Sequence, residues 1–395
     1  MGAPVTLTEA VASLAKNAVR VALERLFPVV PTLRQRVVHG YPVHEGNSVE
    51  VVRWLADNYP GRVYWLVDRG ADVRWLLRGT REPQRVRLLP PRSVRALLAY
   101  VLAEQVYFTH GLFQCPQPRG RRVFINLWHG DGPKPSSRLD APRRPRSTLL
   151  VAGTRVYGLE KAAAFGTPPH QLVVCGNPRI DQLARPISDG QLGRLGIAPD
   201  RPFIVWAPTF RRATVAGSAG WSDAPTLSST LADPGEVRGI ARIVDGFGLQ
   251  LVVKPHPLDA DDYGRYGMPV VTDRELAACE ATLGGFLARS AALVTDYSSI
   301  WIDYLPLDRP IAYFCPDLEA YTEGRGLSHR GIESSGAGPM LRHAEDFRAF
   351  CAAIRADRTT GADVRRARID DLGVVVQFGA TRRLFEAVDG RPVTR

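Results

Sequence analysis

The sequence predicts an α/β protein of two domains, each built on a parallel sheet, with a cleft between the carboxyl ends of the two sheets. Short apolar runs alternate with helical stretches, which is the pattern of repeated βα units. The pattern pauses at a segment rich in glycine and proline, residues 184–200, and then starts again. A chain of 395 residues is long enough for two such domains.

The first domain is predicted over residues 1–183 and the second over residues 201–395, with 184–200 as the linker. Strands of the first domain are expected at residues 36–38, 63–67, 86–88, 105–109, 122–127, 149–152 and 172–174, and helices at 48–58, 73–78, 91–102 and 157–165. Strands of the second are expected at 202–206, 249–253, 270–272, 292–295 and 311–314, and helices at 236–246, 276–281, 298–305 and 344–356. The last helix of the chain is expected to pack back on the first domain.

Residues 8–27 have apolar side chains at helical spacing, and two interpretations stay open for this helix. It packs on the first domain, or it lies in the surface of an anionic membrane. The run is not apolar enough to span a bilayer. Glu9, Lys16 and Arg20 interrupt it, so it also lacks the layout of a signal peptide.

The formal net charge of +11 favours an anionic partner, but it does not choose among a nucleotide, an anionic polymer, a membrane surface and nucleic acid. The sequence has no motif of a nucleic-acid-binding module. The cysteines are scattered and odd in number, which indicates a reduced chain with neither a disulfide framework nor a zinc site. No metal ligands are assigned.

An apolar strand that ends in Trp-His-Gly places His129 at the predicted cleft. A neutral imidazole there could accept a proton from an attacking hydroxyl near pH 7. The alternative is a structural hydrogen-bonding histidine. A second strand ends in Lys-Pro-His-Pro, and strand alternation makes Lys254 and His256 point the same way. Together they would bind phosphate, unless they are a surface lysine and a turn histidine.

The segment from Thr295 to Ser299 follows a strand and precedes a helix. Ser298 or Ser299 would cap that helix, and its free backbone N–H groups would bind phosphate or pyrophosphate. Ordinary capping without a ligand is the alternative. Asp303, further along this helix, is expected to make contacts within the fold.

Three loops after strand ends offer further ligand groups. Thr209 provides a hydroxyl, and the guanidinium of Arg211 could donate two hydrogen bonds to phosphate oxygens. The alternative is that this loop is only solvated. Asp317 and Glu319 could hold ribose hydroxyls, and Arg325 could meet phosphate. Residues 212–235 are expected to be mobile, and residues 138–146 form a loop rich in proline and arginine. The Asn-Pro-Arg-x-Asp segment at residues 177–181 is expected to shape the hinge between the domains.

Taken in order, these motifs resemble the CDP-glycerol glycerophosphotransferase family of teichoic acid primases and polymerases. The matching segments are Trp-His-Gly, Gly-Asn-Pro-Arg-x-Asp, Ala-Pro-Thr-Phe-Arg, Lys-Pro-His-Pro, Thr-Asp-Tyr-Ser-Ser-x-x-x-Asp-Tyr, and Arg-Pro-Ile followed by Asp-Leu-Glu-x-Tyr and Arg-Gly. The resemblance extends from about residue 37 to residue 327.

The resemblance implies a GT-B-like fold of two Rossmann-like domains, with the donor bound mainly by the second. It implies transfer of a polyol phosphate from CDP-glycerol or CDP-ribitol to a lipid-linked or polymeric acceptor, on the inner face of the cell membrane. His129 and His256 match the essential histidine pair, and residues 295–299 match the donor pyrophosphate site.

The loop after His129 carries the acceptor-side residues, which are Gly130, Asp131 and Lys134. The family more often has Thr-Pro and lysines there, so the acceptor environment differs. No cofactor is obligatory, and Mg²⁺ arriving with the donor stays compatible with the sequence.

Two other functions remain compatible with the sequence. A GT-B glycosyltransferase would use a nucleotide sugar, and a non-catalytic basic protein would bind an anionic polymer. Release of UDP rather than CMP on turnover would indicate the glycosyltransferase. Salt-dependent binding of an anionic polymer without turnover would indicate the non-catalytic protein. The sequence leaves open the choice of primase or polymerase, and the oligomeric state.

Overall fold

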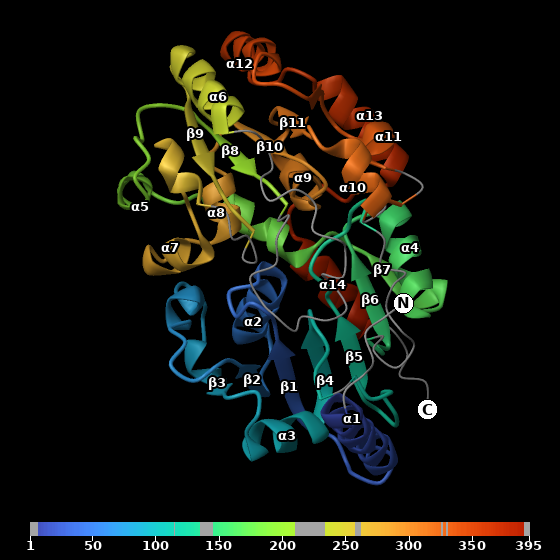
Figure 1. Cartoon of the computed structure of the whole chain (residues 1–395). Helices are drawn as coiled ribbons and strands as arrows, with labels where there is room; N and C mark the ends of the chain where they lie inside the picture. The colour runs from blue at the N-terminus through green and yellow to red at the C-terminus, as the bar shows by residue number, and fades with distance from the viewer. Residues whose placement is uncertain are drawn as a thin grey trace.

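The computed structural model describes residues 7–113, 115–134, 145–209, 234–256, 262–324, 327–328 and 331–390. Within these ranges the chain forms two parallel sheets, one of seven strands and one of five. Figure 1 shows one sheet above the other, with helices covering both. The predicted α/β class with two parallel sheets is therefore confirmed.

The first sheet has the strand order β3-β2-β1-β4-β5-β6-β7, and its strands pair in parallel. Apolar side chains alternate between its two faces: Val38 and Tyr107 pack on one face, Val37 and Val106 on the other. Both faces are buried, as expected for a parallel sheet. The strands are β1 (Leu33–His39), β2 (Arg62–Leu66), β3 (Val86–Leu89), β4 (Ala103–Phe108), β5 (Val123–Asn126), β6 (Leu149–Ala152) and β7 (Leu172–Val174).

The second sheet has the strand order β12-β11-β10-β8-β9, again parallel throughout. Its strands are β8 (Phe203–Ala207), β9 (Gln250–Val253), β10 (Ala292–Thr295), β11 (Ile311–Phe314) and β12 (Met340–Leu341). The residues of β8, β10 and β11 are all buried. Because β8 and β10 are neighbours, the loops that follow them open side by side at one edge of the sheet.

Helices cover both sheets. The α-helices are α1 (Leu7–Leu26), α2 (Gly46–Asn58), α3 (Val94–Val101), α4 (Arg155–Phe165), α5 (Asp189–Arg194), α6 (Pro234–Gly246), α7 (Asp273–Ala278), α8 (Leu283–Leu287), α9 (Ile300–Tyr304), α10 (Leu318–Gly324), α11 (Ile332–Ser335), α12 (Asp346–Ala356), α13 (Ala362–Leu372) and α14 (Ala380–Asp389). The 3-10 helices are η1 (Arg74–Leu77), η2 (Pro83–Arg85), η4 (Pro169–Gln171), η5 (Pro178–Ala184), η6 (Tyr263–Tyr266) and η7 (Leu305–Leu307).

Four local features differ from what the sequence led us to expect. Residues 270–272 form only an isolated bridge, between Val270 and Val253. Residues 73–78 form the tighter helix η1 instead of an α-helix. Residues 184–200, expected as a linker, contain α5, whose start is fixed by a capping box between Ser188 and Gln191. Residues 317–326 were expected as a loop, but residues 318–324 form α10.

The last helix, α14, leaves the second half of the chain and packs on the first sheet. The ring of Phe385 stacks on Trp54 of α2 with centroids 3.7 Å apart, and Leu384 joins the apolar core around Val38. The helix start is held by Asp181, whose carboxylate accepts hydrogen bonds from the backbone N–H groups of residues 379–381.

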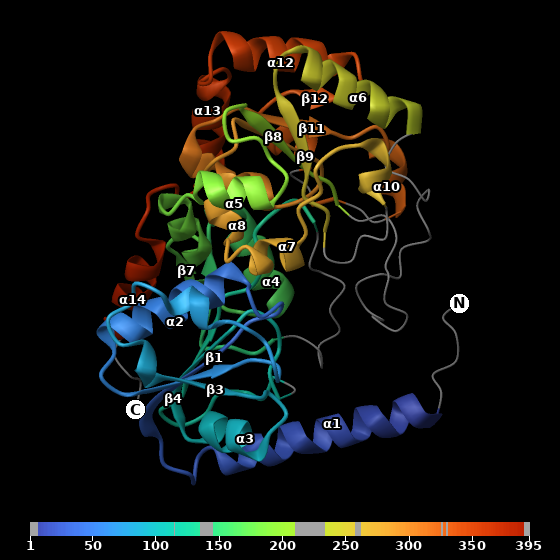
Figure 2. The same cartoon turned by 90° about the vertical axis from the view of Figure 1, so that its left-hand side faces the viewer.

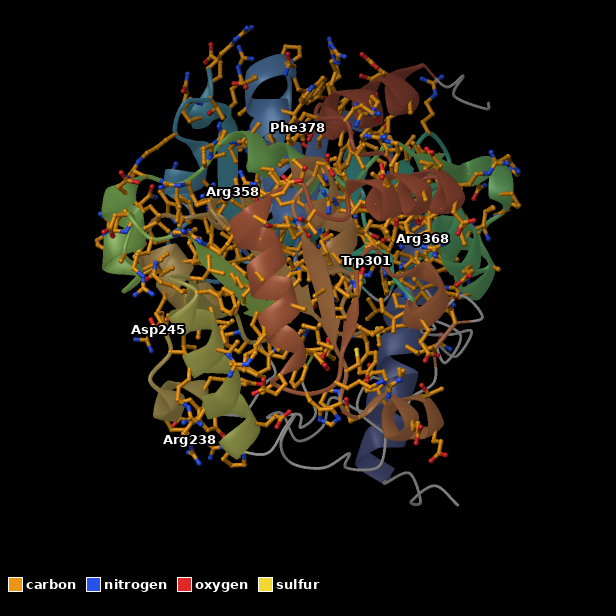
Figure 3. The ribbon with its side chains drawn as sticks, turned by 90° about the horizontal axis from the view of Figure 1, so that it is seen from above. Arg238, Asp245, Trp301, Arg358, Arg368 and Phe378 are labelled. Atoms are coloured by element: carbon orange, nitrogen blue, oxygen red, sulfur yellow. The ribbon has the colours of Figure 1, made fainter. Side chains whose placement is uncertain are left out.

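The two halves also share an apolar core. Tyr157 of α4 and Ile180 of η5 belong to the same buried cluster as Tyr297 and Trp301 of the second half. Figure 3 looks down on the second half, with Trp301 among the packed elements and Arg238 at the outer edge on α6. The contact between the halves is therefore a packed interface.

Helix α1 extends from the first domain at the end opposite the second sheet (Figure 2). The segment that follows α1 is fastened by the buried Arg122, which donates hydrogen bonds to the carbonyls of Phe27 and Val30 and to that of Val101 at the end of α3. Among the helices that the structure describes, none is long and apolar enough to cross a membrane.

Candidate active site

The site is built where loops from the two sheets meet. The loop after β5 carries His129, and the turn after β10 carries Ser299. A Cβ added to Gly130 would lie 2.5 Å from Ser299 Oγ, and one added to Gly132 would lie 2.9 Å from Ser299 Cβ. Only glycine permits this approach, so the sequence brings the Trp-His-Gly loop directly against the predicted phosphate-binding turn.

The backbone around His129 has an unusual conformation. Trp128 has φ 50°, in the left-handed region that non-glycine residues rarely occupy, and Gly130 has φ 141°. Two hydrogen bonds hold the loop: Asn47 donates to the Trp128 carbonyl at 3.1 Å, and Arg179 donates to the His129 carbonyl at 2.9 Å. Backbone strain held by its surroundings is common at functional sites.

The imidazole of His129 is half-buried and lies among aromatic rings. It stacks on His110 with centroids 4.5 Å apart and planes at 8°, and lies 4.0 Å from the Trp128 ring. Burial holds the pKa of His129 well below its ordinary value, and His110, Lys161 and Arg179 lower it further. A hydrogen bond with the Thr109 backbone opposes this shift. The ring is therefore neutral at pH 7 and can accept a proton.

The loop after His129 also crosses to the second half. Lys134 donates a hydrogen bond to Thr209 Oγ1 at 3.2 Å, and the Pro133 carbonyl accepts one from the Ser328 N–H at 2.6 Å. Thr209 in turn bonds the buried Asp296, with Oγ1 to Oδ1 at 2.6 Å and N to Oδ2 at 2.8 Å. Predicted acceptor-side and donor-side residues thus touch across the domain boundary.

Asp131 has a different place from the one predicted. Its side chain is 1% exposed, and Oδ2 accepts hydrogen bonds from the N–H groups of Gly153 and Thr154 at 2.5 and 2.8 Å. Its Oδ1 lies 3.6 Å from the buried Lys161 ammonium. The carboxylate is enclosed, so it supports the loop from inside and does not face an acceptor.

Lys254 is also enclosed. Its side chain is 6% exposed, and its ammonium lies 2.8 Å from Asp273 at the start of α7 and 3.0 Å from the Pro255 carbonyl. The Lys254 ammonium, which was predicted to bind the donor phosphate, is thus already bonded to two groups of the protein. Thr295 is fully buried, and its hydroxyl donates to the Ala207 carbonyl at 2.8 Å, so it too belongs to the fold.

His256 lies beyond the carboxyl end of β9 and is half-buried. The strand order puts β8 between β9 and β10. Neighbouring strands are about 4.8 Å apart, so β9 lies roughly 10 Å from β10, which leads to Ser299. His256 is therefore at the same sheet edge as Thr209 and Asp296, one strand from β8 and two strands from β10.

The remaining predicted residues differ in how much the structure says of them. Ser298 and Ser299 are half-buried at the start of α9, and Ser298 Oγ accepts from the Ile300 N–H at 3.4 Å. Asp317 accepts a hydrogen bond from the Tyr297 hydroxyl at 3.0 Å, and Glu319 is exposed on α10. The structure does not describe Arg211 or Arg325. Of the loop predicted over 212–235 it describes only residues 234–235, and of residues 138–146 only 145–146.

A network under the site joins the two halves. Arg179 donates to the Asp303 carboxylate as well as to the His129 carbonyl, and Asn177 donates to Asp303 at 2.8 Å. Glu45, at the start of α2, lies 3.5 Å from the same guanidinium, and burial raises its pKa, although Arg179 opposes the shift. The sequence predicted a hinge role for residues 177–181, but nothing in it indicated that Glu45 would join this network.

Histidines end three neighbouring strands. His39 is the last residue of β1, His110 follows β4, and His129 follows β5, in a sheet where these strands are adjacent. His39 and His110 were missed, although His110-Gly111 after an apolar strand repeats the pattern that identified His129. Among the described residues, no group of three or more His, Cys, Asp or Glu side chains could hold a metal ion.

Two parallel sheets whose carboxyl-end loops face one another define a GT-B-like protein. The structure of the wall teichoic acid polymerase TagF has a TM-score of 0.71 to this chain at 17% identity, over 96% of this chain and 97% of that one. MnaA of S. aureus, solved with UDP, has a TM-score of 0.52 at 11% identity, over 90% and 96%. At such identities the likeness shows the fold, and it confirms the predicted class.

The chain belongs to the CDP-Glycerol:Poly(glycerophosphate) glycerophosphotransferase family, whose model matches residues 42–388. The teichoic acid poly(glycerol phosphate) polymerase of Bacillus spizizenii is 38% identical in an alignment of length 260 that covers 58% of this chain and 60% of that protein. The teichoic acid ribitol-phosphate primase of the same organism is 35% identical over 85 residues, 22% of this chain and 20% of the primase. The chain thus spans 60% of the polymerase that it matches.

Proposed function

We propose that the chain transfers a glycerol phosphate from CDP-glycerol to a hydroxyl of a lipid-linked or polymeric acceptor and releases CMP. The observation that carries this proposal is the contact between the His129 loop and the Ser299 turn, within a chain that belongs to the family. This contact brings the loop that carries a neutral imidazole against a turn suited to bind phosphate. The names of the relatives support a cell-wall polyol phosphate polymer as the product class.

The proposed reaction is an in-line displacement at phosphorus. An acceptor hydroxyl oxygen attacks the β-phosphorus of the donor, and the bond from that phosphorus to the bridging oxygen breaks, so CMP leaves with the bridging oxygen. His129 accepts the hydroxyl proton. Positioning and charge stabilisation supply most of the catalysis in such reactions.

The other predicted residues take supporting roles in this proposal. The backbone and hydroxyl groups of Ser298 and Ser299 bind the diphosphate, and His256 neutralises the leaving phosphate. In this proposal Asp317 binds the nucleoside and Lys134 lies on the acceptor side. Thr209, 2% exposed and bonded to Asp296 and Lys134, holds the two loops together. Arg211 and Arg325 stay as expected phosphate clamps. No obligatory cofactor is part of the proposal, and a chelator in the assay tests whether donor-bound Mg²⁺ contributes.

A donor screen tests the proposed function. Purified protein is incubated with CDP-glycerol, CDP-ribitol or UDP-N-acetylglucosamine and an acceptor, and the released nucleotide is measured. The proposal predicts CMP from CDP-glycerol that rises with acceptor concentration. CMP release from CDP-ribitol alone would support the same reaction with CDP-ribitol as the donor. Release of UDP alone would indicate a glycosyltransferase, and no release from any donor would contradict the proposal.

We also propose that the chain attaches peripherally to the inner face of the cell membrane through the end of the first domain formed by α1 and α3. These elements and the turn between α1 and β1 carry exposed apolar side chains, namely Val19, Leu26, Val29, Val94 and Leu98. Arg25, Arg92 and Arg95 are exposed on the same elements. Apolar side chains flanked by arginines are the pattern of a surface that binds anionic lipid.

A further inference from the structure

The ring of His110 is the nearest aromatic partner that another strand brings to His129. β4 and β5 pair in parallel with Phe108 opposite Asn126, and the Leu127 N–H bonds the Phe108 carbonyl at 2.7 Å. This register places the residues that follow the two strands side by side at the site. The two imidazoles then lie almost parallel, with centroids 4.5 Å apart and planes at 8°.

His110 is itself held from two sides. The edge of the Tyr41 ring meets it at 81° with centroids 5.6 Å apart, and Thr109 Oγ1 lies 3.1 Å from its Nδ1. The Thr109 hydroxyl accepts the Tyr41 N–H at 3.1 Å, which leaves its own proton available for Nδ1 of His110. That pattern fits a neutral ring with its proton on Nε2. The orientation of His110 is therefore fixed by the fold.

We propose that His110 is a positioning residue that holds the His129 ring in one plane and shields one face of it from water. The stacked face limits rotation of His129 and excludes water from one side of the ring. This inference rests on the proposed function of His129 as the base and extends it to a residue outside the family motifs quoted above.

The charges around the pair agree with this role. Burial and, to a smaller extent, His39 at the end of β1 together lower the pKa of His110 to about 4. The cations Lys161 of α4 and Arg179 of η5 also lower the pKa of His129. The partners of these two cations are the carboxylates of Asp131, Glu45 and Asp303. The stacked His110 ring keeps His129 desolvated, and charge on both stacked rings at once is unfavourable, so His110 also lowers the pKa of His129.

Two substitutions separate stacking from general structural support. His110→Ala removes the ring, so water reaches His129 and its pKa rises toward the ordinary histidine value. A base must be neutral to act, and its activity is lost as the pH falls through its pKa. The acid limb of the kcat profile should therefore move to higher pH by about one unit. kcat at pH 7.5 should fall about 10- to 100-fold, because the ring is less well placed.

His110→Phe keeps a stacked ring without a titratable group, so it should restore most of the rate and the acid limb of the native protein. His170→Ala is the matched control, because His170 is exposed on η4 at the amino end of β7 and should leave both unchanged. Thermal unfolding of each variant checks that the fold is retained.

The His129 titration, followed by NMR of the protein with labelled histidines, gives a readout that does not need turnover. A higher pKa of His129 in His110→Ala, reversed in His110→Phe, supports the inference even if no donor is turned over, in which case only the proposed function fails. An unchanged His129 titration in His110→Ala would overturn the inference, whether or not the rate falls. Equal behaviour of the two variants would overturn it as well.

Discussion

At the scale of single residues, the site depends on the close approach of two glycines to a serine. Gly130 and Gly132 let the loop after β5 lie against Ser299, and the positive φ of Trp128 and Gly130 turns His129 between them. The carbonyl of His129 is held by Arg179, which also bonds Asp303 in the second half. The placement of the proposed base thus depends on both halves of the chain.

Gly130→Ala should disable the site. The new methyl group would lie 2.5 Å from Ser299 Oγ and 2.8 Å from Arg179 Nη2, at a backbone φ that alanine avoids. We expect CMP release to fall at least tenfold and the free energy of unfolding to drop by about 1–3 kcal/mol, measured by urea unfolding. Gly190→Ala in α5 is the matched control, because its methyl group meets only Ser188 Oγ, at 4.0 Å. Equal effects of the two changes would contradict this account.

The pH dependence of the native protein follows from the lowered pKa of His129. A lowered pKa means that the ring stays neutral until the pH falls below the ordinary histidine value of about 6.5. CMP release should therefore be nearly constant from pH 8 down to about pH 6.5 and should decline only below it. Initial rates across this range check the prediction, and a midpoint at or above the ordinary value would refute it.

The sequence could predict which residues lie at the end of a strand, but it could not predict which partners their side chains would bond. His129, Thr209 and Ser299 each follow an apolar strand, and parallel strands must end at one edge. Lys254, Asp131 and Thr295 also follow or end strands, yet their side chains are taken up by Asp273, Lys161 and the Ala207 carbonyl. Those partners are distant in sequence, so no local pattern could reveal them.

At the scale of elements, the short parallel strands were the easiest to predict, because most of them contain a short apolar run that is buried. Tight helices such as η1 and the two-residue strand β12 have no such signature. The capping box of α5 could have been found, since Ser188 is followed by Gln191 three residues later. The glycine and proline content of the segment favoured a linker instead.

Helix α14 ties the end of the chain to the first sheet, and Asp181 secures its start. Asp181→Ala removes the acceptor of three backbone N–H groups. We expect the free energy of unfolding to fall by about 1–2 kcal/mol in urea titrations. Asp181→Asn keeps one acceptor oxygen and should lose about half as much. An unfolding curve of Asp181→Ala that matches the native protein would show that the cap does not hold the helix.

At the scale of the whole molecule, the site lies between the two halves, while α1 and α3 form the opposite end of the first domain (Figure 2). If that end lies on the membrane, the first sheet stands between the lipid surface and the site. A long polymeric or lipid-linked acceptor would bridge this distance along the protein.

Membrane attachment can be tested by sedimentation with lipid vesicles. The protein should bind vesicles that contain phosphatidylglycerol and bind pure phosphatidylcholine much less. The double variant Val94→Glu with Leu98→Glu should lose at least tenfold in affinity, because it places charge on the apolar surface. Val364→Glu, at an exposed position on α13, is the matched control. Unchanged binding of the double variant would exclude α3 from the attachment surface.

The most direct test of the account is the rate of CMP release from CDP-glycerol by His129→Asn, compared with the native protein at pH 7.5 with acceptor present. Asparagine fits the space but cannot accept the proton. We predict a rate at least 100-fold lower with an unchanged unfolding temperature. A folded His129→Asn protein that releases CMP at the native rate would contradict the central claim that this imidazole is the base.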